Sequence, residues 1–132
     1  MPIGDDEWHK LANGWYADPV SVLRISPNLS VRLGVATTLV FVRPEYVQKI
    51  RFKHSIEPRH FEHLPTMVSS GTAYLDHRTK NTIQIIYVGN ERTFRLVLKG
   101  IPDKNEIWIS TFHTIGPKEL KRRLKRMGSP IK

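Results

Sequence analysis

The feature that most constrains the fold is a series of four strand-like runs in the second half of the chain. These runs are rich in β-branched and aromatic residues and span 72–75, 82–88, 93–99 and 106–114. The segments that join them are short and rich in Gly, Asn, Asp and Pro, the residues of turns. Because such short connections join antiparallel neighbours, the sequence predicts a four-stranded antiparallel meander.

Helical patterns flank these strands. Pro44 followed by an acid marks a helix start, and apolar residues at helical spacing carry that helix to about residue 54. A second helical pattern covers 57–70 and is interrupted at Pro65, and a basic helix is expected over 118–127. The predicted class is α+β, with N-terminal helices packed on an antiparallel sheet of four or more strands and a basic C-terminal helix.

The chain of 132 residues fits a single folded unit with an N-terminal extension. Residues 1–43 form that extension, in which a short strand is expected at 22–25. The apolar, β-branched run 31–42 is expected to form a buried strand or strand pair. Residues 44–132 form the main domain and include the basic segment 117–132.

Composition excludes several classes of function. The chain has no cysteine, so disulfides, thiolate metal sites and cysteine nucleophiles are ruled out. No apolar run approaches the roughly 20 residues that span a bilayer, and the acidic N-terminus lacks an apolar signal core. We therefore expect no membrane partner, no export signal within the chain and a cytoplasmic site of action. Glycine motifs for nucleotides or hydrolase serines are absent, so no cofactor is expected.

The net charge of +9 points to an anionic partner. Nucleic acid is the leading candidate, ahead of an anionic membrane or an acidic protein. Much of the excess lies in 117–132, where a single acid accompanies seven cations: Lys118, Lys121, Arg122, Arg123, Lys125, Arg126 and Lys132.

A second concentration of basic groups lies at residues 50–65, which hold three of the six histidines together with three cations. This stretch is either a solvated basic helix edge or an acid–base site for an anionic substrate. His60 and His63 are three residues apart, which is within reach of a shared metal ion. Because the neighbouring cations would repel a divalent ion, no metal site is expected.

The strand 93–99 separates apolar from basic side chains. Its alternation puts Phe94 and Leu96 on one face, which we expect in the core, and Arg95 and Lys99 on the other. Arg95 is either solvated on an open sheet face or held rigidly enough to grip a phosphate through two hydrogen bonds.

The last strand changes character along its length. Strict alternation would group Ile107, Ile109, Thr111 and His113 on one side and Trp108, Ser110, Phe112 and Thr114 on the other. Each side then begins apolar and becomes polar. Either the strand leaves the core for water, or it delivers a hydroxyl and an imidazole to a cleft.

Histidine, lysine and arginine without a cofactor are the groups that a metal-independent ribonuclease needs. The 2′-hydroxyl of RNA is an internal nucleophile, so the enzyme has to move protons and neutralise the phosphorane. Histidine suits proton transfer near neutral pH, and arginine or lysine suits the phosphate.

Four short motifs, in this order, resemble one group of the barnase–EndoU–colicin–RelE-like nuclease class. The match covers roughly residues 44–114, whereas 1–43 resemble no known motif. The motifs are Lys53-His54 at a helix end, Leu64-Pro65 before the apolar Met67-Val68 and a Gly71 turn, the strand Phe94–Lys99, and the strand Ile107–Phe112.

The resemblance implies a ribonuclease toxin or phage-associated domain that acts on RNA without metal and is restrained by an antitoxin or immunity protein. An acidic inhibitor would suit the basic chain. His54 would be the general base or acid, Lys53 and Arg95 would hold the phosphate, and Thr111 would orient it. Ser110 neighbours the matched Thr-Phe pair, and His113 is added on chemical grounds as the partner acid. Further RNA contacts are expected from the basic residues Arg51, Arg59, His60, Lys99, Lys118, Lys121, Arg122, Arg123, Lys125 and Arg126.

Two other functions fit the same sequence. The first is a non-catalytic RNA- or DNA-binding module, in which a stripe formed by Leu120, Leu124 and Met127 docks the basic helix on the sheet and its cations face phosphates. The second is a phage or effector accessory domain whose basic tail binds an acidic partner.

Overall fold

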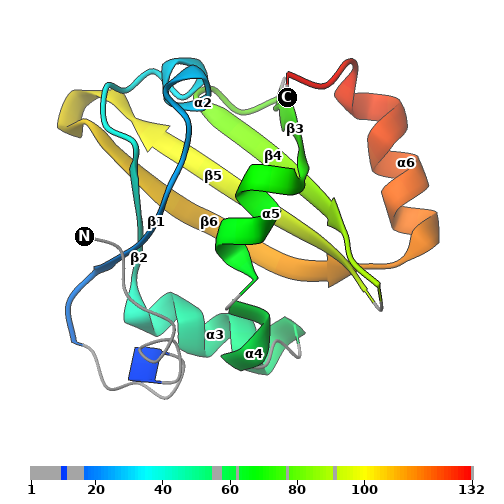
Figure 1. The fold of residues 1–132 in the computed structure, drawn as a ribbon, viewed down its shortest axis with the longest axis horizontal. Helices are drawn as coiled ribbons and strands as arrows, with labels where there is room; N and C mark the ends of the chain where they lie inside the picture. The colour runs from blue at the N-terminus through cyan, green and yellow to red at the C-terminus, as the bar shows by residue number, and fades with distance from the viewer. Residues whose placement is uncertain are drawn as a thin grey trace.

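The computed structural model describes residues 10–11, 17–54, 58–61, 63–76, 78–90 and 92–131, and gives only the backbone for 50–54 and 58–59. Six strands form one mixed sheet in the order β1-β2-β6-β5-β4-β3 (Figure 1). The strands are β1 (Val20–Arg24), β2 (Leu39–Val42), β3 (Thr72–Leu75), β4 (Thr82–Val88), β5 (Thr93–Ile101) and β6 (Glu106–Ile115).

The α+β class is confirmed, and the sheet is mixed rather than wholly antiparallel. Consecutive strands from β3 to β6 pair antiparallel, whereas β2 pairs with β6 in parallel and β1 pairs with β2 antiparallel. All the helices and strands from α3 to β5 lie between β2 and β6 in the chain. A connection of that length allows the chain to return in the same direction, which a short turn does not.

The helices are α2 (Pro27–Arg32), α3 (Pro44–His54), α4 (Pro58–Phe61), α5 (Leu64–Ser70) and α6 (Pro117–Met127), with a 3-10 turn η1 (Pro102–Lys104). The second predicted helix is divided into α4 and α5, and Pro65 occupies the first turn of α5, where its missing N–H costs nothing. The strand expected at 22–25 is present as β1, and because β1 and β2 precede α3, the helices do not all lie N-terminal to the sheet.

The prediction of a strand over 31–42 is also wrong for most of that run. Residues up to Arg32 belong to α2, and only 39–42 are extended. Ser26 caps the helix by accepting a hydrogen bond from the Leu29 N–H, and Pro27 fixes its first turn. Val31, a β-branched residue, lies on the solvent side of α2 with 72% of its surface exposed, so its strand propensity is overridden.

One face of the sheet, which we call the core face, carries the main hydrophobic core. Apolar side chains of β4, β5 and β6 pack there against residues of α2, α3, α4 and α5, such as Phe61 and Met67. Phe61 contacts Phe112 with ring centroids 5.4 Å apart. Gly100 lets the turn after α2 approach β5, because a Cβ there would lie 2.2 Å from the carbonyl oxygen of Leu33.

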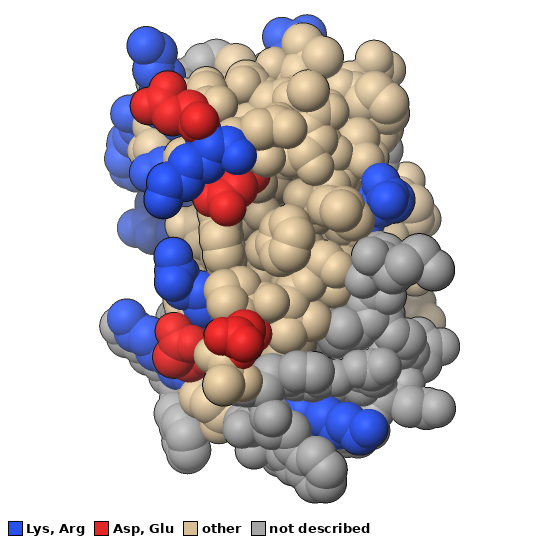
Figure 2. All heavy atoms as spheres, turned by 90° about the vertical axis from the view of Figure 1, so that its left-hand side faces the viewer, with Lys and Arg blue, Asp and Glu red and all other residues tan. Residues whose placement is uncertain are grey.

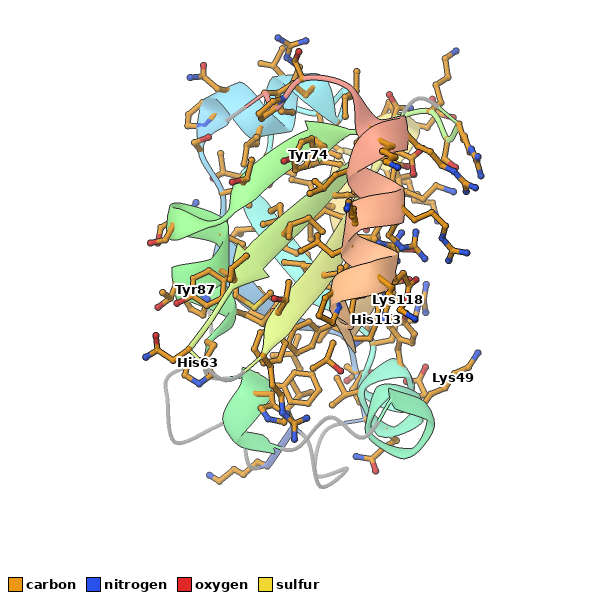
Figure 3. The ribbon with its side chains drawn as sticks, turned by 90° about the vertical axis from the view of Figure 1, so that its right-hand side faces the viewer. Lys49, His63, Tyr74, Tyr87, His113 and Lys118 are labelled. Atoms are coloured by element: carbon orange, nitrogen blue, oxygen red, sulfur yellow. The ribbon has the colours of Figure 1, made fainter. Side chains whose placement is uncertain are left out.

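The opposite face, which we call the α6 face, has a smaller apolar cluster. Ile86, Ile115 and Met127 are buried there, and Tyr74 and Leu120 pack at its margin. Helix α6 therefore crosses the back of the sheet on the side of β3 and β4 (Figures 1 and 3). Of the predicted docking stripe, Leu124 departs from the expectation, because 38% of its surface is exposed.

Candidate functional site

A one-residue bulge in β6 decides which side chains reach the α6 face. Val97 pairs with Thr111 but Leu98 pairs with Ile109, so Ser110 is an extra residue in the strand. Tyr46 of α3 donates a hydrogen bond from its hydroxyl to the carbonyl oxygen of Ser110 and thereby anchors the bulge.

The bulge corrects the expected alternation of the last strand. It returns Phe112 to the core face together with Ile107 and Ile109, and all three are buried. Trp108, Thr111 and His113 consequently share the α6 face. The change from apolar to polar along each predicted side therefore results from the shift in register at the bulge. It does not mean that the strand leaves the core.

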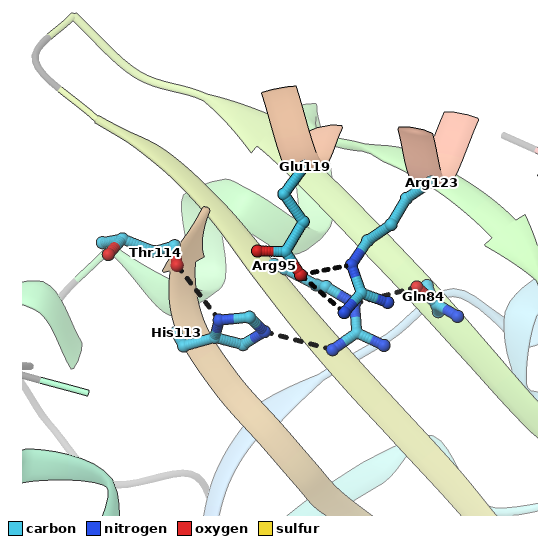
Figure 4. A network of polar contacts seen from close by, with 6 residues as sticks. All are labelled: Gln84, Arg95, His113, Thr114, Glu119 and Arg123. Carbon is cyan, nitrogen blue, oxygen red and sulfur yellow. Dashed lines mark hydrogen bonds and ion pairs between the residues drawn. The ribbon is translucent and has the colours of Figure 1, made fainter. Parts of the chain in front are cut away.

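Arg95 and His113 form the centre of the candidate site. They are direct cross-strand partners in β5 and β6. The Nη1 of Arg95 lies 3.1 Å from the Nε2 of His113, and the Nε of Arg95 donates to the Oε1 of Gln84 at 2.9 Å (Figure 4). Both residues are half-buried, so each is fixed by its neighbours yet open to a ligand.

The two ring nitrogens of His113 have different partners. Arginine only donates, so Nε2 of His113 has to accept the hydrogen bond from Arg95. The Nδ1 lies 3.0 Å from the carbonyl oxygen of Thr114, which only accepts, so Nδ1 carries the proton. These two contacts fit the neutral tautomer, in which Nδ1 carries the proton and the lone pair of Nε2 faces Arg95. Removal of Arg95 from this contact would leave a base able to take up a proton.

Asp76 supports this arrangement from the β3–β4 connection. Its Oδ2 accepts a hydrogen bond from the Nε2 of Gln84 at 3.0 Å, and its Oδ1 accepts from the backbone N–H groups of Arg78 and Thr79. Burial raises the pKa of Asp76, but hydrogen bonds from Arg78, Gln84 and Thr79 outweigh it and hold that pKa below its usual value. Asp76 thus orients the Gln84 amide so that its oxygen faces Arg95.

A basic pocket of about 300 Å³ lies beside this network, between α6 and the sheet. Its lining includes Asp76 and five arginines: Arg78, Arg95, Arg122, Arg123 and Arg126. Arg123 is paired with Glu119 at 2.7 Å, and this hydrogen bond lowers the pKa of Glu119.

The electrostatics of the basic pocket favour an anion. Burial, together with the nearby charge of Arg123, lowers the pKa of Arg95 from its ordinary value. Because a guanidinium stays charged at neutral pH even so, the cations remain and repel one another. A phosphate would relieve that repulsion and would accept hydrogen bonds from several arginines.

The predicted site residues are only partly brought together here. Thr111 shares the α6 face with His113 and Arg95, and Ser110 lies exposed in the bulge. Lys99 is exposed opposite Trp108, farther along the strand. The side chains of Arg51, Lys53, His54 and Arg59 lie outside the described residues. Of the predicted tail contacts, Arg122, Arg123 and Arg126 line the pocket, whereas Lys118, Lys121 and Lys125 lie elsewhere on α6.

His60 is not the surface residue that its helical position suggests. Only 5% of its surface is exposed, and its ring packs on Phe94 with centroids 5.5 Å apart on the core face. It lines a separate cavity of about 380 Å³ with His63 and Tyr87. Figure 3 shows His63 and Tyr87 on the other side of the sheet from His113 and Lys118. His60 therefore belongs to the packing of α4 rather than to the basic pocket.

Gln84 and Asp76 belong to the candidate site, although sequence patterns do not single them out. The available signal is a lone amide in the mainly apolar strand β4, where Gln84 is buried with only 8% of its surface exposed. A buried amide needs hydrogen-bond partners, so its neighbours across the sheet are expected to be polar. The identity of those neighbours depends on the strand register.

Comparisons with protein families, with curated proteins and with solved structures find no match to this chain. Among the described residues, none of the helices combines the length and apolar character needed to cross a membrane. In that same part of the chain, no three His, Asp or Glu side chains are grouped so that they could hold a metal ion. The chemistry of the site is therefore inferred from its own geometry.

Proposed function

We propose that this protein is a metal-independent endoribonuclease toxin that cleaves RNA by attack of the 2′-hydroxyl on the adjacent phosphate. The observation that supports it best is the contact between the Nε2 of His113 and Arg95, which is one of the arginines that line the basic pocket. A proton acceptor beside a phosphate-binding guanidinium is the combination that transesterification requires.

In the proposed reaction, the substrate phosphate takes the place of His113 as the partner of Arg95. The freed Nε2 removes the proton from the 2′-hydroxyl as the 2′-oxygen forms its bond to phosphorus. The bond from phosphorus to the 5′-oxygen breaks, and the departing oxygen receives a proton from a second acid. The products are a 2′,3′-cyclic phosphate and a 5′-hydroxyl, and Arg95 with Arg123 offsets the charge of the phosphorane.

His54 is the second proton-transfer residue in this proposal, as the nuclease resemblance implies, with Lys53 as a further phosphate contact. Both lie at the C-terminal end of α3. This helix starts at the end of β2 and runs beneath the sheet toward the side on which β6 ends (Figure 1). Its Tyr46 is hydrogen-bonded to the bulge of β6. Thr111 and Ser110 would orient the phosphate between the two histidines.

The proposed partner besides RNA is an acidic antitoxin or immunity protein. A surface with a net charge of +9 attracts an acidic protein at long range, and an inhibitor that covers the arginines of α6 would close the pocket. Inhibition of cleavage by such a protein, lost when the pocket arginines are removed, would support this role.

The proposal is tested by incubating the purified protein with total RNA in EDTA and following fragmentation on a denaturing gel. We expect cleavage by the wild type and a loss of at least about 100-fold in rate for His113→Ala, Arg95→Ala and His54→Ala. Arg32→Ala, which removes an exposed cation of α2, is the control and should cut normally. Wild-type rates in His113→Ala would rule out the role assigned to that residue, and binding without cleavage would favour a non-catalytic module.

A further inference from the structure

Trp108 forms an aromatic platform on the α6 face, away from the basic pocket. Its ring lies 5.8 Å from that of Phe41 in the neighbouring strand β2, and the guanidinium of Arg43 sits 4.8 Å above the ring. The indole Nε1 donates a hydrogen bond to Glu106 at 3.3 Å, which fixes the orientation of the ring. Trp108 and Phe41 are both half-buried, so the platform keeps an accessible surface.

The surroundings of the platform are open and carry more positive than negative charge. A shallow cavity of about 270 Å³ is lined by Trp108, Arg43, Tyr46, Lys99, Lys104 and Glu106. Arg43, Lys99 and Lys104 are exposed. Viewed from the side of β1, the surface shows Lys and Arg gathered along one margin with a few acidic side chains between them (Figure 2). A strongly anionic, extended ligand with flat apolar groups would complement this combination.

The platform is aligned with the Arg95–His113 pair. Lys99 pairs with Trp108 and Arg95 pairs with His113 along the same two strands. All four side chains project from the α6 face, because the bulge at Ser110 brings Trp108 and His113 into phase. Arg95 and Lys99 are four positions apart along β5, a distance of about 13 Å at roughly 3.3 Å per residue. A few nucleotides of single-stranded RNA can span that distance.

We propose that the Trp108 platform, made of Phe41, Arg43 and Trp108, binds an unpaired base of single-stranded RNA that flanks the phosphate held by Arg95. Unstacked bases bind to aromatic rings and to guanidinium planes, and Lys99 and Lys104 lie where the adjoining phosphates would pass. A base within a duplex is already stacked, so this subsite selects single-stranded substrates. This proposal rests on the proposed function, because it specifies which form of RNA the site binds. The binding step itself does not depend on cleavage.

The test measures binding of short oligonucleotides that carry 2′-O-methyl groups and cannot be cleaved by this chemistry. Fluorescence anisotropy would compare a single strand, its duplex and the same strand with abasic positions. We expect the wild type to bind the single strand about tenfold more tightly than either of the others. Trp108→Ala should lose that advantage, while Trp108→Phe should retain most of it. Val31→Ala, which truncates an exposed apolar side chain of α2, is the control and should bind as the wild type does.

The abasic probe keeps the test decisive even where a variant fails to fold, because it uses the wild-type protein alone. Equal affinity for the intact and abasic strands, or equal affinity of the wild type and a folded Trp108→Ala, would overturn the proposal. A base-dependent affinity without any RNA cleavage would uphold the platform and reject the nuclease. RNA cleavage whose rate does not change with Trp108→Ala or with abasic positions would uphold the nuclease and reject the platform.

Discussion

The two faces of the sheet bury different kinds of side chain. The core face is covered by apolar side chains of β4, β5 and β6, and Leu96 and Phe112 are fully buried there. The α6 face has a small apolar cluster at one side, and next to it a chain of hydrogen bonds from Asp76 through Gln84 and Arg95 to His113. Burial of such groups costs free energy unless they are paired. Apolar residues could fill the α6 face without needing hydrogen-bond partners. Because this face keeps polar and charged groups instead, we place the function there.

Truncation of the core face should have the largest effect on stability. Phe112→Ala removes a fully buried ring that contacts Phe61 and Phe94. We expect a loss of about 3–5 kcal/mol in the free energy of unfolding. Chemical denaturation followed by circular dichroism measures it. A loss below about 1 kcal/mol would mean that the two faces do not differ as described.

The same kind of truncation at His113 should affect activity far more than stability. His113→Ala removes a half-buried ring and leaves the core face intact, so we expect a change of about 1 kcal/mol or less in the free energy of unfolding. Its rate of RNA cleavage should fall by at least about 100-fold. Paired denaturation and cleavage measurements on one preparation separate the two effects. A large loss of stability would instead identify His113 as a packing residue.

The docking of α6 can be compared at two positions of one helix. Met127 is buried between α6 and the sheet, whereas Leu124 keeps 38% of its surface exposed. Met127→Ala should cost about 2 kcal/mol in the free energy of unfolding, and Leu124→Ala about 0.5 kcal/mol or less. Similar losses at both positions would show that the helix packs through the wider stripe that its sequence suggests.

The contribution of Asp76 should depend on pH. Its pKa in the folded protein is lower than the usual 3.8, so the ionised carboxylate stabilises the fold above that value. The stabilisation is lost as the pH falls from about 3.8 through the lowered pKa. Near neutral pH we expect Asp76→Asn to cost about 1 kcal/mol, since solvent screens this accessible carboxylate. The gap between wild type and Asp76→Asn, measured by denaturation, should close in acid. A gap that widened in acid would contradict the hydrogen-bonded carboxylate.

Local sequence patterns account for much of this fold. The strands from β3 to β6 and the helices α3 and α6 lie close to their predicted ranges, because Pro, Gly and Asn mark their ends and their periodicity is clear. Helix α2 is not predicted, because Val31 and its β-branched neighbours resemble a strand. The cap at Ser26 and Pro27 is the signal that outweighs them.

The candidate site was less predictable, because it depends on contacts between strands. Arg95 is recognisable as a cation flanked by apolar residues, and His113 as an imidazole at the polar end of β6. Their pairing requires the register between β5 and β6 and the bulge at Ser110, and neither follows from periodicity within one strand. The contact of Gln84 with Arg95 likewise depends on a register, that between β4 and β5.

The most direct test of the central claim is the chemistry of the RNA ends. Total RNA would be treated in EDTA with the wild type or with His113→Ala, and the 3′ ends of the fragments identified by mass spectrometry. We predict 2′,3′-cyclic phosphate ends with the wild type and intact RNA with the variant. Intact RNA in both samples, 3′-hydroxyl ends, or equal cleavage by the variant would contradict a His113-dependent transesterification.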